Sequence, residues 1–323
     1  MKIRNKFISI AAVVLLGIIL STCTQKPSSP LRIGVPVWPG FECLYLARDL
    51  GYYKNTSIRL VDYRANSEMI RAFRNGELEG AALTIPEAFS LETAESNLQF
   101  VLATDVSNGG DAILAKPEIK NLQALKGRRI GFDSSAALGP YMLIQALEQI
   151  NFSPKDIQII SIGISEHERA FKKGTVEAVV TFEPTRSKLL AAGARVVFDS
   201  RKIPGEIVDV IAVRGDVLTN QLPNLQALVN GWFRALNYLK NNPQNAARRI
   251  APREGITPKR FLESLEGIRL LSLQENKKLL GKTDTTLLNG IKRLSKKLVE
   301  NNLAKQVVDH THLLNDQLVN NVK

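Results

Sequence analysis

The sequence predicts an α/β protein of two lobes, each built around a mostly parallel sheet, and three observations support this class. The chain has 323 residues, 44% of them apolar, which is enough for a large core divided between two lobes. Strand and helix patterns alternate along most of the chain, and the alternation restarts once. One phrase also occurs twice, as AFRNGELEGAALTIPE at 72–87 and as AFKKGTVEAVVTFEP at 170–184, with Gly80 as the extra residue of the first copy.

The first round of alternation follows a polar stretch that ends at Pro30. Short apolar runs predict strands, and apolar residues at helical spacing followed by Gly or Asn predict helices. The predicted strands are Leu31–Val35, Ile58–Val61, Gly80–Leu83 and Phe100–Ala103. The predicted helices are Phe41–Leu50, Ser67–Phe73 and a segment that begins at Pro86, a residue suited to a first helical turn.

The second round has the same composition. Its predicted strands are Arg128–Phe132, Ile157–Ser161 and Val176–Val180, and its predicted helices are Pro140–Ile150, Glu166–Lys172 and Pro184–Ala191. From Asp216 onward the pattern is largely helical, and apolar residues around Trp232 recur at helical spacing. This spacing predicts that Trp232 faces a core.

The N-terminus is typical of an export signal. Lys2, Arg4 and Lys6 precede the apolar run Phe7–Leu20, whose length of about 14 residues is too short to span a bilayer of ~30 Å. A basic start followed by a short apolar region indicates a secretory signal peptide, which we place at residues 1–22. This segment is therefore not expected to be part of the fold.

The end of this signal, Leu20-Ser21-Thr22-Cys23, resembles the lipobox of bacterial lipoproteins. The resemblance implies a lipid on Cys23, a linker at 23–30 and a protein anchored on the periplasmic or cell-surface side of a membrane. Thr22 departs from the usual Gly, Ala or Ser before the cysteine, so simple cleavage and an uncleaved anchor stay open as alternatives. With Cys23 lipidated, Cys43 has no intrachain partner, and we expect it to be a small buried group.

The charge pattern argues against nucleic acid as a partner. Lys and Arg exceed Asp and Glu by 43 − 31 = 12, but the basic residues are scattered among acidic ones and form no aromatic-rich basic stripe. The chain has three His and no complete catalytic or metal-binding motif. We therefore expect no catalytic residues, no cofactor and no metal ion, and a monomer whose ligand is a small molecule.

The repeated phrase predicts two similar corners. In each copy a helix ends at Gly76 or Gly174, a strand of small residues follows, and Thr84 or Thr181 lies near the carboxyl end of that strand. Ligands of open α/β sheets bind outside these strand ends, where hydroxyl groups and helix N-termini converge. Each corner alone is also explained as a turn with a capping Thr, but the pair predicts two walls of one cleft.

Further similarity lies in stretches that follow one another along residues 31–240: LRIGVPVWPGFECLYLARDLGYY, RAFRNGELEGAALT, VLATDVSNGGDAILAKPEIKNLQALKGRRIG, AFKKGTVEAVVTFEP and GARVVFDSRKIPGEIVDVIAV. Together they resemble the substrate-binding proteins of ABC importers in the sulfonate, nitrate, taurine and thiamine-precursor group. The resemblance implies a type II periplasmic-binding-protein fold, in which two lobes joined by two crossover strands close over a small solute. It also implies an ABC permease and an ATPase as partners.

The two crossovers can be placed in this sequence. Asp111–Ala115 follows a loop that ends at Gly110, and Ile207–Val213 follows Pro204-Gly205. Loop residues of this kind absorb changes in backbone dihedral angles. We therefore expect hinge residues at Gly110, Asp111, Gly205 and Asp209, lobe 1 at 31–110 plus 206–323, and lobe 2 at 111–205.

The resemblance also implies a ligand site with residues from both lobes. From lobe 1 these are Trp38, Gly40, Thr84, Asp105 and Ser107, and from lobe 2 Ser134, Ser135, Thr181 and Glu183. A core position for Trp38, turn chemistry for the two serines and a helix-dipole role for Glu183 are the structural alternatives. A Glu183 or Glu87 that faces the cleft would favour a solute with amino or N–H groups over nitrate or sulfate.

Two other functions stay open at this point. A receptor that presents its closed lobes to a membrane signalling protein has the same sequence features as a transport protein. A thiamine-pyrimidine-synthase-like enzyme shares the fold, but it is cytosolic and relies on a cysteine-rich iron site, whereas this chain has an export signal and two Cys. The identity of the solute is not determined by the sequence, because one fold accepts many ligands through changes in a few loop side chains.

Overall fold

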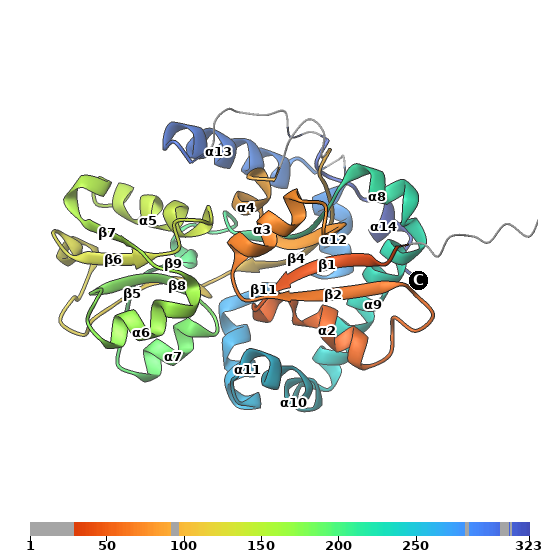
Figure 1. The fold of residues 1–323 in the computed structure, drawn as a ribbon, viewed down its shortest axis with the longest axis horizontal. Coiled ribbons are helices and arrows are strands. Elements are labelled where there is room, and N and C mark those ends of the chain that lie inside the picture. Colours follow the sequence, from red (N-terminus) through yellow and green to blue (C-terminus); the bar gives the residue numbers. More distant parts are fainter. Residues whose placement is uncertain (1–28, 92–96, 282–283, 304–309, 311) are drawn as a thin grey trace, which may run out of the picture. The chain divides into compact units, whose positions relative to one another are not determined.

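The computed structural model describes residues 29–91, 97–281, 284–303, 310 and 312–323. The predicted signal peptide and Cys23 lie outside these residues. The chain divides into two compact units, of which the second, Leu31–Lys323, contains both sheets. Figure 1 shows its helices and strands. None of the described helices has the length and apolar character needed to cross a membrane.

One sheet is formed by six strands, namely β1 (Leu31–Pro36), β2 (Ile58–Tyr63), β3 (Gly80–Thr84), β4 (Gln99–Ser107), β10 (Val208–Val213) and β11 (Ile268–Leu270). Their order is β11-β4-β10-β3-β1-β2. Strand β1 pairs in parallel with β2 and β3, whereas β10 runs antiparallel to β3 and β4, and β11 runs antiparallel to β4. All residues of β3, β4 and β10 are buried.

A second sheet is formed by β5 (Asp111–Ala115), β6 (Arg129–Phe132), β7 (Gln158–Ser161), β8 (Ala178–Phe182) and β9 (Arg195–Asp199), in the order β7-β6-β8-β5-β9. Strands β7, β6 and β8 are parallel, and β5 is antiparallel to both β8 and β9. Both sheets are therefore mixed. The prediction of mostly parallel sheets holds for three neighbouring strands of each sheet, because the crossover strands β10 and β5 and the edge strand β11 run in the opposite direction.

Two connections join the sheets, where the sequence predicts them. Strand β4 of the first sheet leads into β5 of the second through residues 108–110, and β9 leads back into β10 through residues 200–207. Gly109 has a φ of +111° and Gly205 a φ of +75°, backbone conformations that glycine adopts without strain. The chain thus leaves the first sheet once and returns once.

Helices connect the parallel strands of each sheet (Figure 1). Those of the first round are α2 (Glu42–Asp49), α3 (Asn66–Arg74) and α4 (Ile85–Phe89), and those of the second are α5 (Leu138–Glu148), α6 (His167–Lys172) and α7 (Thr185–Ala191). All were predicted, with small differences at their ends. Strands β9 and β11 were not predicted, because both are short edge strands without a clear apolar alternation.

The C-terminal part is largely helical, as predicted. It comprises α8 (Gly215–Asn220), α9 (Leu222–Asn241), α10 (Pro243–Glu254), α11 (Pro258–Ser264), α12 (Leu273–Leu280), α13 (Thr286–Glu300) and α14 (Gln317–Asn320). Trp232 on α9 is fully buried, which confirms its core position. Cys43 is also buried and is not in a disulfide, and burial raises the pKa of its thiol, so it is a packing residue.

Asn276 on α12 holds this helix against the middle of β4. Its Oδ1 accepts a hydrogen bond from the Ala103 N–H at 2.8 Å, its Nδ2 donates to the Ala103 carbonyl at 2.8 Å, and the side chain is fully buried. The amide therefore pairs with both backbone groups of one strand residue. Strand β4 continues directly into a crossover, so this clamp fixes the strand from which the crossover starts.

We predict that Asn276→Ala lowers the free energy of unfolding by about 2–4 kcal/mol, because two buried backbone groups lose their partner. Urea unfolding measures this change. The control is Asn241→Ala, which removes an exposed amide bonded to Asn237 and is expected to change stability by less than about 0.5 kcal/mol. Equal midpoints for Asn276→Ala and wild type would contradict this role.

Candidate functional site

The two repeated corners meet at adjoining cavities within the second unit. Thr84 lines one cavity and Thr181 lines the other, and both cavities are lined by Asn66, Glu87, Asp111, Leu138 and Phe182. We call these two spaces the inner cavities. They leave about 30 Å³ and 20 Å³ for the centres of water molecules. Each cavity is therefore large enough for only a few water molecules.

The first corner is fixed by a capping box. The Thr84 hydroxyl accepts a hydrogen bond from the Glu87 N–H at 3.3 Å, and the Glu87 carboxylate accepts bonds from the Thr84 N–H at 3.1 Å and hydroxyl at 3.0 Å. Asn66, at the start of α3, donates to the other carboxylate oxygen at 2.6 Å. The corner thus forms because a Thr ends β3 three residues before a Glu. It also turns Glu87 and Asn66 toward the inner cavities.

The second corner is built differently. The Thr181 hydroxyl lies 3.2 Å from Nδ1 of His167, and Nε2 of this His lies 3.2 Å from the Ile162 carbonyl oxygen. Burial lowers the pKa of His167 to about 4, so the imidazole is neutral near pH 7. Thr181 lies within β8 and does not cap α7. The two corners are alike in sequence, but only the first is a capping box.

Trp38 forms an aromatic contact across the site. Its ring packs edge-on against Phe182 of the second sheet, with centroids 6.0 Å apart, and both residues line an inner cavity. The indole N–H points toward the Asp105 carboxylate, at 3.3 and 3.4 Å from its two oxygens. Trp38 is nearly fully buried, so it is at once a core residue and part of the cavity wall.

Gly40 makes room for the contact between Trp38 and Asp105. A Cβ atom at this position would lie 2.1 Å from Oδ2 of Asp105 and 2.4 Å from Nε1 of Trp38. The missing side chain is therefore needed for this contact, and the predicted close approach of a ligand to the Gly40 backbone stays a prediction.

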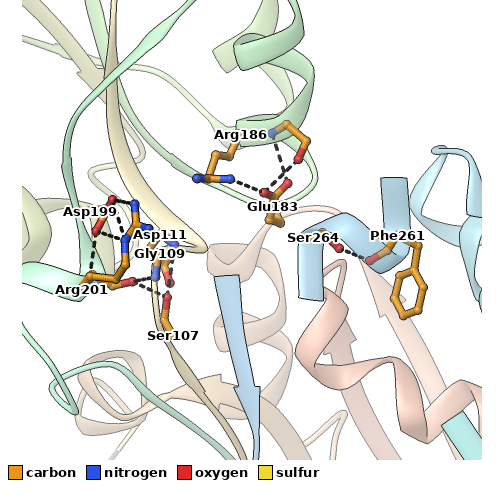
Figure 2. Close-up of polar contacts among 11 residues, drawn as sticks. Ser107, Gly109, Asp111, Glu183, Arg186, Asp199, Arg201, Phe261 and Ser264 are labelled. Atoms are coloured by element: carbon orange, nitrogen blue, oxygen red, sulfur yellow. Dashed lines mark hydrogen bonds and ion pairs between the residues drawn. The ribbon is translucent and has the colours of Figure 1, made fainter. Parts of the chain in front are cut away.

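Ser107 belongs to the crossovers. Its hydroxyl lies 2.8 Å from that of Ser200 and accepts a bond from the Asp111 N–H at 3.2 Å, while the Ser200 hydroxyl accepts from the Gly109 N–H at 2.6 Å. Figure 2 shows this group beside the ion pair of Asp199 with Arg201. The two chain passages are therefore tied together by short polar side chains, and Ser107 is engaged in this contact between them.

Glu183 is also engaged locally. Its carboxylate accepts bonds from Arg186 at 2.9 Å and from the N–H and hydroxyl of Ser187 at 3.1 and 3.0 Å (Figure 2). These contacts stabilise the start of α7, which is the helix-terminus alternative. Ser134 and Ser135 are exposed and make turn contacts, with Ser161 and with Asp133 respectively. Their neighbour Asp133 lines an inner cavity instead.

Three carboxyl groups of the crossover strands lie at the site. Asp105 on β4 and Asp209 on β10 are opposite one another in the sheet, and Asp111 begins β5. Burial raises the pKa of Asp105 to about 6 and that of Asp111 to about 7, and burial together with the Asp105 charge raises the pKa of Asp209 well above its usual value. Burial also raises the pKa of Glu87. The site therefore holds acidic groups that are costly to ionise.

The sequence predicted Asp111 and Asp209 as hinge residues only. In the structure both residues also line the inner cavities. It did not identify Asn66, Asp133, His167 or Phe182 as lining residues. The signal for Phe182 was present, since it follows Thr181 in the repeated phrase. Asn66 and His167 carry no such signal, because both begin helices that are otherwise ordinary in sequence.

The raised pKa of Asp111 predicts a pH-dependent stability. A carboxyl whose folded pKa is raised from 3.8 to about 7 stabilises the fold while it is neutral, and this contribution is lost as pH rises through about 7. Asp111→Asn should therefore gain stability relative to wild type between pH 4 and pH 8, by up to about 4 kcal/mol at 1.36 kcal/mol per unit. Urea unfolding at both pH values measures this, and a difference that stays constant with pH would refute it.

Comparisons with known proteins agree with this architecture. The sequence model of the NMT1-like family matches residues 24–252. A putative aliphatic sulfonates-binding protein of Escherichia coli (strain K12) is 28% identical over 151 residues, which are 46% of this chain and 47% of that protein. The matched region thus spans about half the length of this relative.

Solved structures share the fold at low sequence identity. The alkanesulfonate-binding protein SsuA from Xanthomonas axonopodis pv. citri, bound to MOPS, has a TM-score of 0.71 at 18% identity, over 90% of this chain and 97% of that chain. The ligand-binding component of an ABC-type import system from Staphylococcus aureus, with zinc bound, has a TM-score of 0.75 at 14% identity, over 91% and 99%. The desulfurization enzyme DSZB reaches 0.65 at 16% identity, over 90% and 98%.

These likenesses establish the fold, which is that of the periplasmic binding proteins, with two mixed α/β sheets joined by two crossovers. The predicted fold class is confirmed. The family rests on sequence, because its model matches more than half of the chain. The protein belongs to the NMT1-like family.

Proposed function

We propose that this protein is an extracytoplasmic solute-binding lipoprotein that captures a small solute between two lobes and delivers it to an ABC importer. The lobes are residues 31–110 plus 206–323 and residues 111–205. One observation carries the proposal: the inner cavities are lined by both sheets, at the carboxyl ends of β3 and β8, beside the two crossovers. Binding proteins with two hinged lobes hold their solutes at such a place.

The small size of the inner cavities supports a hinged mechanism. Spaces for only a few water molecules do not admit an organic solute of ordinary size unless the walls move. The crossovers, with left-handed Gly109 and Gly205, are the segments that can absorb this movement. A solute that contacts both lobes then favours the form in which they are closed around it.

The relatives support a binding role more than a catalytic one. The E. coli relative, the Xanthomonas protein and the Staphylococcus protein are described as binding proteins, and DSZB is described as an enzyme. In this chain the described residues that line the inner cavities include no Cys or Lys, and His167 is neutral and bonded to Thr181. Cys43 is buried, and its raised thiol pKa disfavours the reactive thiolate.

The site assignment predicts a loss of binding on truncation of either wall. A solute at a hundredfold excess over its Kd stabilises wild type by about 2.7 kcal/mol, which appears as a rise in Tm. Trp38→Ala and Thr181→Ala should each abolish this rise, because each removes a side chain of one wall. The measurement is a thermal-shift screen with sulfonates, taurine, nitrate, thiamine pyrimidines, flavins and polyamines.

The control for this screen is Thr219→Ala, which changes an exposed residue of α8. It should respond to the solute as wild type does. Folded Trp38→Ala and Thr181→Ala proteins that both keep the full rise would place the solute elsewhere.

The proposed anchor predicts a change of location. Wild type should sediment with membranes after cell fractionation, and Cys23→Ser should appear in the soluble fraction, because the thiol that carries the lipid is gone. Membrane association of both proteins would indicate an uncleaved anchor, and solubility of both would indicate simple cleavage.

A further inference from the structure

We infer that the solute carries a protonated nitrogen, such as an amine, amidine or guanidinium, and that it is held by the carboxyl groups of the crossover strands. This inference rests on the proposed function and specifies its solute. It differs from what the names of the sulfonate-binding relatives suggest, since a sulfonate is an anion.

The inner cavities are acidic. Among the described residues that line them, four are acids, Glu87, Asp111, Asp133 and Asp209, and none is Lys or Arg. The one His there is neutral near pH 7. A sulfonate in this space would find no Lys, Arg or charged His to balance its charge, which is costly in a buried site of low dielectric. A cation has the opposite effect, because its charge lowers the cost of ionising the buried carboxyl groups beside it.

Asp209 is hydrogen-bonded to Asp105, but one of its carboxyl oxygens lacks a partner. Its side chain is 1% exposed, it lines an inner cavity, and its Oδ1 has no hydrogen-bond partner in the structure. Buried polar atoms without partners are rare in folded proteins and are costly to leave unsatisfied. Asp209 also lies between Asp105 and Thr84 across the neighbouring strands. Asp209 thus brings an oxygen without a partner to the wall of an inner cavity, where an N–H donor would satisfy it.

The other three acids differ in whether their carboxyl oxygens already accept hydrogen bonds. Both oxygens of Glu87 accept bonds from Asn66 and Thr84, and the Asp133 carboxylate accepts from Ser135. These two contribute negative potential but are already bonded. Asp111 lines both inner cavities, and its position at the first residue of β5 puts it on the second sheet. Asp209 and Asp111 therefore offer one carboxyl from each sheet to the same solute.

The walls suit a flat apolar group beside the charge. Trp38 and Phe182 pack against each other at one side, and Leu138 and Met142 line the cavities from α5. Aromatic faces also attract cations. The combination of carboxyl groups and aromatic rings fits a solute with a small ring and a protonated nitrogen.

An outer cavity at the same site carries basic residues and offers the competing place for an anion. It is lined by Arg64, Lys188 and Arg253 among others, and it shares Asn66 and Phe182 with the inner cavities. Arg253 is already paired with Glu42 and Asp62. An anionic solute would bind there, away from Asp209, so the charge of the solute and its dependence on Asp209 distinguish the two places.

Matched probes of opposite charge test the inference on the full-length protein. The cations are benzylamine, benzamidine and methylguanidine, and the anions are benzenesulfonate, benzoate and methanesulfonate. Isothermal titration calorimetry at pH 7 should detect binding of at least one cation and of no anion. Asp209→Asn keeps the shape of the side chain and should weaken cation binding at least about tenfold, because an amide cannot ionise to balance the charge of the bound cation. Asp111→Asn should act in the same direction.

The control variant is Asp216→Asn, whose side chain is 64% exposed on α8. It should bind the cations as wild type does, and circular dichroism checks that all variants are folded. Anion binding that Asp209→Asn leaves unchanged, or a failure of every cation at millimolar concentration, overturns the inference. In either case the thermal-shift screen tests the proposed function separately. If that screen finds an anionic or neutral ligand, the solute-binding function stands and only the inference of a cationic solute fails. If it finds no ligand of any charge, both the function and the inference fail.

Discussion

Buried carboxyl groups are the constraint on which this site depends. Asp105, Asp111 and Asp209 are almost fully shielded from water, and they belong to the strands that carry the chain between the two sheets. Ionised carboxylates in such surroundings require protons, hydrogen-bond donors or a cation to compensate them. Burial raises the pKa values of all three groups, so that they tend to keep their protons, which meets part of this requirement. The site is thus less stable at neutral pH than an apolar one would be, as is common where residues serve a ligand.

The surrounding structure positions these acids and keeps other polar groups occupied. Thr84 closes a capping box with Glu87, and Thr181 is bonded to His167, so neither hydroxyl is left without a partner. The Ser107 and Ser200 hydroxyls tie the two crossovers together. Helix and turn contacts thus account for most of the polar groups that the sequence offered as ligand contacts. The side chains that remain to contact a solute in the inner cavities are the aromatic pair Trp38 and Phe182 and the carboxyl groups.

The sequence was sufficient for the fold because local pattern and family resemblance agreed. The alternation of strands and helices predicted the parallel part of each sheet, and the loops at Gly110 and Gly205 predicted the crossovers. The site was harder to predict. Trp38, Thr84 and Thr181 do line the inner cavities, but Ser134, Ser135 and Glu183 are engaged in turn and helix contacts, for which the same residue types are equally suited. Asp209 lies beside Thr84 and Asp105 because of the register in which β10 pairs with β3 and β4. The sequence does not reveal this register.

A crystal structure with the tightest-binding probe tests the central claim most directly. The account predicts a ligand enclosed between the two sheets, with its nitrogen within hydrogen-bond distance of Asp209 Oδ1 and its apolar part against Trp38 and Phe182. A ligand seated in the outer cavity beside Arg64 and Lys188, with Asp209 still lacking a partner, would contradict it.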